Sequence, residues 1–195
     1  MDFPSTLART ELILGGQKSG KSARAEALAR DWLAASADHD AVLIATGQAH
    51  DEEMAERIAR HRRERASRVP GMATVEEPLR LAPCIDRLAL PSTLLVVDCL
   101  TLWLVNWLMP VEPRGQADPA GAFEAQADAL IAALGRRAGP TVLVSNEIGL
   151  GVIPMGRDVR AYVDALGTLN RRLAQVCERV TLMTAGLPLC LKGRA

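Results

Sequence analysis

The chain carries the stretch Gly15-Gly16-Gln17-Lys18-Ser19-Gly20-Lys21-Ser22, which matches the phosphate-binding pattern G-x-x-x-x-G-K-[ST]. An apolar run at residues 11–14 precedes this stretch, and an amphipathic segment at residues 22–35 follows it. A loop between a strand and a helix directs backbone N–H groups, and the positive end of the helix, at phosphate oxygens. Glycines are needed there because a Cβ atom would block the close approach of the backbone to the anion. The stretch therefore predicts a nucleotide phosphate site within an α/β fold.

Two side chains of this loop have predicted roles in triphosphate chemistry. Lys21 is expected to reach the β- and γ-phosphates, and the Ser22 hydroxyl is expected to ligate Mg²⁺. A second magnesium ligand is expected at the end of a neighbouring apolar strand, where Asp98 follows the run Leu94 to Val97. Asp is also a good N-cap residue, so capping of the next helix stays open as the alternative. For the loop itself, the alternative is an ordinary glycine-rich turn with a surface lysine.

Strand-like and helix-like segments alternate along the rest of the chain. Expected strands lie at residues 11–14, 41–45, 74–76, 94–98, 141–145 and, as the last one, 180–184. Expected helices lie at residues 22–35, 51–65, 100–109, 119–137 and 158–177, with a further helix that begins at Pro78. The alternation predicts a three-layer fold of the P-loop NTPase type, in which helices flank a mostly parallel sheet. We expect a single domain over residues 11–195, preceded by a short flexible lead at residues 1–10.

Composition and charge disfavour several classes of protein. The 195 residues include 23 Lys and Arg against 23 Asp and Glu, with a pI near 6.8, which argues against binding nucleic acid or anionic membrane through bulk electrostatics. Asp98 and Asn106 interrupt the apolar run from Leu94 to Val111, so this run predicts a strand and a helix rather than a membrane span. Four cysteines without a C-x-x-C pair indicate neither a zinc site nor a disulfide framework. This cysteine usage is typical of a reducing cytoplasm.

The expected helix at residues 51–65 has acidic residues in its first half and arginines in its second, which complements the helix dipole. His61 stands out because Arg57 and Arg65, four residues before and after it, share its face of the helix. Two fixed cations favour the neutral imidazole, which leaves a nitrogen nucleophile in a cationic patch suited to a polyphosphate. On spacing alone, a solvated histidine explains the position equally well.

Three further stretches, together with the phosphate loop, resemble a known family. They are Ala45-Thr46-Gly47-Gln48, Glu53-Met54-x-x-Arg57-Ile58-x-x-His61-Arg62 and Asn146-Glu147-Ile148-Gly149-Leu150-Gly151-Val152-Ile153-Pro154. From about residue 11 to about residue 192, the chain resembles the bifunctional adenosylcobinamide kinase/adenosylcobinamide-phosphate guanylyltransferases of cobalamin biosynthesis. The stretch from Asn146 to Pro154 is far more specific than the phosphate loop, because it separates this family from other small P-loop kinases.

The resemblance implies functional residues outside the phosphate loop. It places a guanylylated nucleophile at His61 and nucleotide contacts at Thr46, Gly47, Gln48, Arg62, Arg63, Glu64, Arg65, Glu76 and Asp98. The sequence also places Asn146 and Glu147 after an expected strand, at the edge of the sheet where ligands bind in open α/β folds. Glu147 is expected either to orient a substrate hydroxyl or metal-bound water, or to cap the glycine turn that follows it. A homo-oligomer is a further implication of the resemblance.

An enzyme of this family would carry out two transfers at phosphorus. A triphosphate, ATP or GTP, gives its γ-phosphoryl group to the aminopropanol hydroxyl of adenosylcobinamide, with Mg²⁺ as the expected cofactor. His61 then attacks the α-phosphorus of GTP, releases pyrophosphate and passes GMP to adenosylcobinamide phosphate, which yields adenosylcobinamide-GDP. Two rival interpretations stay open: a P-loop kinase of another small metabolite without a covalent intermediate, and a nucleotide-binding module that is not an enzyme. A small-GTPase switch is disfavoured because no Asn-Lys-x-Asp motif occurs.

Overall fold

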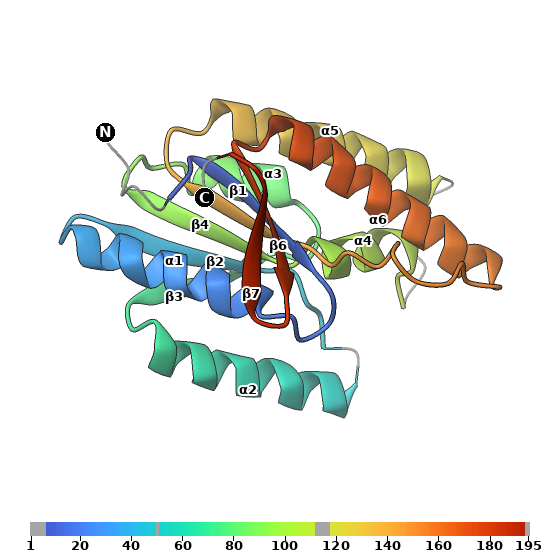
Figure 1. Ribbon diagram of the computed structural model, residues 1–195, viewed down its shortest axis with the longest axis horizontal. Helices are drawn as coiled ribbons and strands as arrows, with labels where there is room; N and C mark the ends of the chain where they lie inside the picture. The colour runs from blue at the N-terminus through green and yellow to red at the C-terminus, as the bar shows by residue number, and fades with distance from the viewer. Residues whose placement is uncertain (1–6, 50, 112–117, 194–195) are drawn as a thin grey trace.

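The computed structural model describes residues 7–49, 51–111 and 118–193. Its strands are β1 (Thr10–Gly15), β2 (Asp40–Ala45), β3 (Met72–Glu76), β4 (Thr93–Asp98), β5 (Thr141–Val144), β6 (Arg179–Thr184) and β7 (Leu187–Lys192). Its helices are α1 (Lys21–Ala35), α2 (Glu52–Arg68), α3 (Leu81–Arg87), α4 (Leu100–Leu108), α5 (Pro119–Arg136) and α6 (Arg157–Val176). The strands form one seven-stranded sheet in the order β3-β2-β4-β5-β1-β6-β7. In Figure 1, α1 and α2 lie below this sheet, and α3, α4, α5 and α6 lie above it.

The sheet confirms the predicted three-layer α/β fold. Every neighbouring pair of strands is parallel except β6 and β7. Successive residues of β1 point to opposite faces, because Leu12 and Leu14 pack in the cluster beneath α3 to α6 and Ile13 packs in the cluster beneath α1. A strand covered on both faces must be apolar throughout, which explains the continuous apolar runs in the central strands. The phosphate loop therefore begins at the end of a strand, β1, that is buried along its whole length.

The helix expected to begin at Pro78 begins instead at Leu81, which corrects the prediction. The carboxylate of Glu77 accepts a hydrogen bond from the main-chain N–H of Leu79 at 3.0 Å, which holds this segment in a turn. The carbonyl of Leu79 accepts a hydrogen bond from the indole N–H of Trp103 in α4 at 2.8 Å. Hydrogen bonds to the neighbouring Glu77 and from the distant Trp103 thus replace the first turn of the expected helix.

A further strand, β7, follows the one expected to be the last. It pairs with β6 in the antiparallel direction across a two-residue turn, in which Ala185 and Gly186 have φ values of 51° and 80°. Positive φ at both central residues gives the twist that a two-residue hairpin needs. The Ala-Gly pair lacks the usual Asn-Gly or Asp-Gly signal, so the sequence pattern did not indicate this hairpin. β7 forms the edge of the sheet and exposes Leu187, Leu189 and Leu191.

The packed domain begins earlier than residue 11. Residues 1–6 of the expected lead lie outside the described residues, but Leu7 is buried and Arg9 pairs with Glu178 at 3.0 Å. Residues 112–117 of the loop at residues 110–119 likewise lie outside the described residues. Within the described ranges, no helix combines the length and apolar character needed to cross a bilayer. The apolar run at residues 94–111 instead contains β4 and α4, as its polar interruptions predicted.

Candidate active site

The phosphate loop joins the end of β1 to the start of α1, as the motif predicts. Gly15 has φ +153°, and a Cβ atom there would lie 2.5 Å from the carbonyl oxygen of Met183, so only glycine fits. Gly20 has φ +100° and stands at the N-cap of α1, where no side chain caps the helix. The first N–H groups of α1 therefore have no side-chain acceptor at the cap, an arrangement suited to an anion.

Lys21 lies within this loop with only 9% of its surface exposed. Its ammonium donates a hydrogen bond to the carbonyl of Gly16 at 2.6 Å, so the side chain folds over the loop instead of entering the core. Burial lowers the pKa of Lys21, and the nearby groups Cys99 and Asp98 oppose that shift. Lys21 and Asp98, at the end of β4, thus interact electrostatically.

Asp98 is the last residue of β4, and Ser22 follows Lys21 in α1. The N-cap of α4 is Cys99 and not Asp98, so the capping alternative does not describe this carboxylate. Hydroxyl and carboxylate oxygens are the hard ligands that Mg²⁺ prefers, and Mg²⁺ usually takes one or two protein carboxylates and completes its shell with water and phosphate. Among the described residues, no group of three or more His, Cys, Asp or Glu could hold a metal on its own. The donors present fit a magnesium ion that arrives with a nucleotide.

The turn that begins at Thr46 is tied to the end of β4. The Thr46 hydroxyl donates to the carbonyl of Cys99 at 2.7 Å and accepts from its N–H at 2.9 Å. Thr46 is fully buried, so its hydroxyl serves the fold. Asn106 of α4 is also buried and donates to the carbonyls of Thr46 and Pro78 at 2.8 and 3.0 Å. Sequence reasoning treated Asn106 only as a break in an apolar run, because its partners are 60 and 28 residues away.

A pocket of about 450 Å³ gathers several of the predicted nucleotide contacts. Gly47 and Gln48 line it from the turn after β2, Arg62 from α2, and Glu76 from the end of β3. Arg62 and Glu76 form an ion pair within it. Arg63 and Glu64, predicted as nucleotide contacts, are exposed, and Glu64 pairs with Arg68 at 2.9 Å.

His61 lies on α2, the helix drawn below α1 in Figure 1, and its side chain is exposed. Arg65 and Arg68, four and seven residues further along, occupy the same side of the helix. Both arginines pair with Glu26 of α1, at 3.9 and 3.3 Å. The face of α2 that carries His61 is therefore turned toward the helix that the phosphate loop opens.

The stretch at Asn146 follows β5 and lies beside the phosphate loop, because the N–H of Glu147 donates to the carbonyl of Gly15 at 3.1 Å. The side chain of Asn170 in α6 donates to the carbonyl of Asn146 at 3.0 Å, a contact that sequence reasoning did not find. The carboxylate of Glu147 accepts from the N–H of Gly149 at 3.2 Å, which is the capping arrangement named as its alternative.

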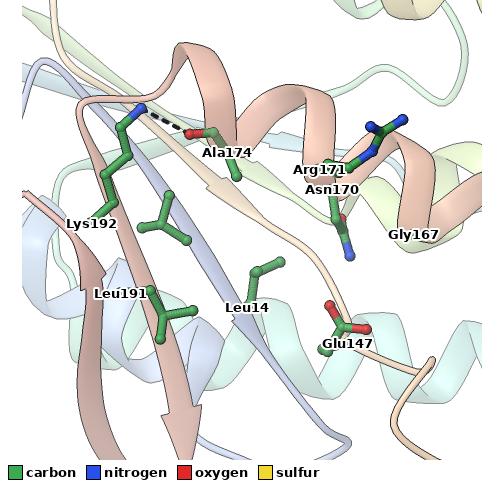
Figure 2. Close-up of a pocket in the computed structure, with 9 residues that line it drawn as sticks. Leu14, Glu147, Gly167, Asn170, Arg171, Ala174, Leu191 and Lys192 are labelled. Atoms are coloured by element: carbon green, nitrogen blue, oxygen red, sulfur yellow. Dashed lines mark hydrogen bonds between the residues drawn. The ribbon is translucent and has the colours of Figure 1, made fainter.

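The side chain of Glu147 also lines a second pocket, of about 310 Å³, between α6 and the strands β1, β6 and β7. Figure 2 shows Glu147 at one end of this pocket and Lys192 at the other, where the lysine bonds to the carbonyl of Ala174. Leu14 and Leu191 supply apolar walls. Lys21 does not line this pocket. What ties Glu147 to the phosphate loop is the main-chain hydrogen bond to Gly15.

The parallel sheet and the phosphate loop define a P-loop nucleotide-binding protein. Similar solved structures include an ATPase domain, with a TM-score of 0.51 and 14% identity over 90% of this chain and 69% of that chain. The flagellar accessory protein FlaH from Methanocaldococcus jannaschii is similar with a TM-score of 0.54 and 10% identity, over 96% of this chain and 80% of that chain. At these identities the likeness shows the fold alone.

The family is shown by sequence. The model of the family described as cobinamide kinase / cobinamide phosphate guanyltransferase matches residues 11–191. The bifunctional adenosylcobalamin biosynthesis protein CobP of Pseudomonas aeruginosa is 47% identical over 184 residues, which are 94% of this chain and 97% of that protein. The corresponding protein CobU of Escherichia coli is 34% identical over 189 residues, which are 93% of this chain and 98% of that protein. The chain thus belongs to the cobinamide kinase / cobinamide phosphate guanyltransferase family, enzymes of cobalamin biosynthesis, which confirms the resemblance.

Proposed function

We propose that this chain phosphorylates adenosylcobinamide and then transfers GMP to adenosylcobinamide phosphate through a covalent His61–GMP intermediate. Family membership supports the two activities. The observation that carries the covalent step is the orientation of α2, whose His61 face pairs with α1 through Glu26. A nucleophile on that face stands beside the helix whose N-terminus is suited to a triphosphate.

In the first transfer, the acceptor hydroxyl attacks the γ-phosphorus and the nucleoside diphosphate leaves. Lys21 supplies fixed positive charge beside the phosphates, and the N–H groups at the start of α1 donate to phosphate oxygens. Ser22 and Asp98 would hold Mg²⁺, which neutralises phosphate charge when it is bound. Positioning and charge suffice for this step, because phosphoryl transfer needs no protein nucleophile.

In the second transfer, a ring nitrogen of His61 attacks the α-phosphorus of GTP, and pyrophosphate leaves as the N–P bond forms. A phosphate oxygen of adenosylcobinamide phosphate then attacks the same phosphorus and breaks that bond, which frees the imidazole. The pocket with Gln48, Arg62 and Glu76 lies on the neighbouring face of α2, where Ile58 supplies an apolar surface for a nucleotide. A covalent intermediate allows GTP and a large corrinoid to occupy the site in turn.

The finer expectations about substrate and assembly belong to this proposal. Asn146 and Glu147 lie on the acceptor side of the phosphate loop, with ATP or GTP as the phosphoryl donor. The loop after them exposes Leu150, Val152 and Ile153, which supports a homo-oligomer. The four cysteines are free thiols, which supports a cytoplasmic location.

Incubation with α-labelled GTP and Mg²⁺, followed by denaturing electrophoresis, tests the covalent step. The wild-type chain is expected to retain label that acid removes and base does not, as a phosphoramidate behaves. His61→Ala is expected to lose the label and guanylyl transfer but to keep measurable phosphorylation of adenosylcobinamide. His39→Ala is the matched control. The His39 ring stacks on Trp32 with ring centroids 3.5 Å apart, so its removal should leave the label in place.

His50, which precedes the same helix, lies outside the described residues and is the nearest competitor in the sequence. Label that persists in His61→Ala and disappears in His50→Ala would move the nucleophile to His50. If the wild-type chain acquires no label but still phosphorylates adenosylcobinamide, the covalent proposal fails and a simple kinase is the better account.

A further inference from the structure

Helix α2 carries the proposed nucleophile, yet it buries none of its 17 residues. Apolar packing therefore contributes little to holding it against the domain. Apart from the pair of Arg62 with Glu76, the described ion pairs that tie α2 to another element both end on one carboxylate, that of Glu26 in α1. Two of the three described ion pairs between α2 and another element therefore depend on this carboxylate.

Glu26 is placed where a carboxylate is costly without partners. Only 8% of it is exposed, and burial raises its pKa, opposed by the charges of Arg68 and Arg65. One carboxylate oxygen lies 3.9 Å from Nε of Arg65, and the other lies 3.3 Å from a guanidinium nitrogen of Arg68. A buried carboxylate is tolerated when cations from a facing element compensate its charge. The compensation here comes from α2.

The spacing of these residues along α1 and α2 relates Glu26 both to the phosphate loop and to His61. Glu26 follows Ser22 by four residues on α1, so both side chains lie on one face of the helix. Arg65 and Arg68 follow His61 by four and seven residues, so all three lie on one face of α2. A single carboxylate, one turn from the proposed magnesium ligand, thus contacts the face that carries the proposed nucleophile.

We propose that Glu26 is a positioning residue for guanylyl transfer. Through Arg65 and Arg68, it holds α2 so that His61 is directed at the α-phosphorus of a triphosphate bound at the phosphate loop. The inference rests on the proposed function of His61. Glu26 itself touches no reacting atom, so the phosphoryl transfer that uses Lys21 does not depend on it.

The test is Glu26→Gln, which keeps the size of the side chain and removes its charge. We expect the single-turnover rate of GMP labelling at saturating GTP to fall by about 10- to 100-fold, as for a misplaced reacting group. The GTP concentration that gives half-maximal labelling should not rise, and phosphorylation of adenosylcobinamide should stay within about threefold of the wild type. Asp31→Asn is the matched control, because Asp31 is an exposed carboxylate of α1 that pairs with Arg30.

A second variant, Arg68→Gln, removes the other end of the pair from an exposed position on α2 and keeps the test valid if Glu26→Gln folds poorly. It should slow labelling in the same way, and the double variant should be less impaired than the product of the two single effects predicts. Equal losses of labelling and phosphorylation, or unchanged labelling in a folded Glu26→Gln, would overturn the inference. A wild-type chain that acquires no label would instead refute the proposed function, so the two failures are distinguishable.

Discussion

The main-chain N–H of Glu147 donates to the carbonyl of Gly15 across 3.1 Å and fastens the turn after β5 to the phosphate loop. Residues 132 positions apart in the chain are thereby held in contact at the carboxyl edge of the sheet. The N–H of Asn146 adds a bond to the Thr101 hydroxyl at 2.9 Å. This edge of the sheet is thus built from several elements, and substitutions there test the two proposed transfers.

Glu147→Gln tests the acceptor role of this side chain. The amide oxygen can still accept from the N–H of Gly149, so the turn should remain intact. If the carboxylate orients the acceptor hydroxyl, phosphorylation of adenosylcobinamide should fall by about 10²-fold or more, while GMP labelling stays at the wild-type rate. Steady-state kinetics and the labelling assay check both outcomes. Unchanged phosphorylation would leave Glu147 with only its capping role, and Glu124→Gln on α5 is the control.

Lys21→Ala tests the electrostatic role of the phosphate loop. Because this ammonium folds over the loop onto Gly16, its removal should cost phosphorylation and guanylyl transfer about 10²- to 10³-fold each and change the melting temperature little. Initial-rate assays and thermal unfolding measure the two effects. Lys192→Ala removes a lysine that bonds to the end of α6 and should keep both rates. Wild-type turnover in Lys21→Ala would contradict the assignment.

Glu11→Ala tests a buried charge network that joins the start of β1 to α1 and β6. The Glu11 side chain is fully buried and bonds to Arg24 at 3.0 Å and to the Thr181 hydroxyl at 2.8 Å. Its removal leaves the guanidinium of Arg24 uncompensated, so the free energy of unfolding should fall by about 3–5 kcal/mol. Urea denaturation measures this loss. Asp86→Ala removes an exposed pair with Arg136 and should cost about 0–1 kcal/mol, and equal losses would count against the network.

Asn106→Leu tests the residue that sequence reasoning missed. The variant leaves the carbonyls of Thr46 and Pro78 without their buried donor, which should lower the free energy of unfolding by about 1–3 kcal/mol. Because the turn at Thr46 leads into the pocket of Gln48, the GTP concentration for half-maximal labelling should also rise. Gln175→Leu, on an exposed position of α6, is the control. A fall in stability without any change in GTP dependence would confine Asn106 to the fold.

Cys177 predicts how stability changes at high pH. Burial raises the pKa of its thiol to about 12 from its ordinary value of 9.0, so both the folded and the unfolded chain hold this proton below pH 9. Between these values only the unfolded chain loses the proton, so stability falls as the pH rises, by up to about 1.4 kcal/mol per pH unit. Urea denaturation at several pH values should show that the free energy of unfolding falls less steeply with pH in Cys177→Ala than in the wild type. Cys190→Ala, at a less buried thiol, is the control, and identical slopes for Cys177→Ala and the wild type would refute the prediction.

The sequence by itself determined the class of fold and the phosphate site. The motif from Gly15 to Ser22 is contiguous, and its glycines and lysine serve one local purpose, so one stretch of chain carries the information. The alternation of strands and helices is likewise a local signal. Each element carries its own apolar pattern, because each must bury an apolar face or stripe against another layer. The family resemblance rested on contiguous stretches as well, and the match to the family over residues 11–191 confirmed it.

The tertiary structure decided what depends on contacts between distant segments. The turn at Pro78 replaced a helix because Trp103 supplies a hydrogen bond from α4. The partners of Asn106 lie in two other loops, and the partners of Glu26 lie on another helix. Sequence periodicity does not indicate such pairs, because the two partners interact only after folding has brought them together. A polar residue in an apolar run shows that some partner exists, and only the folded chain shows which one it is.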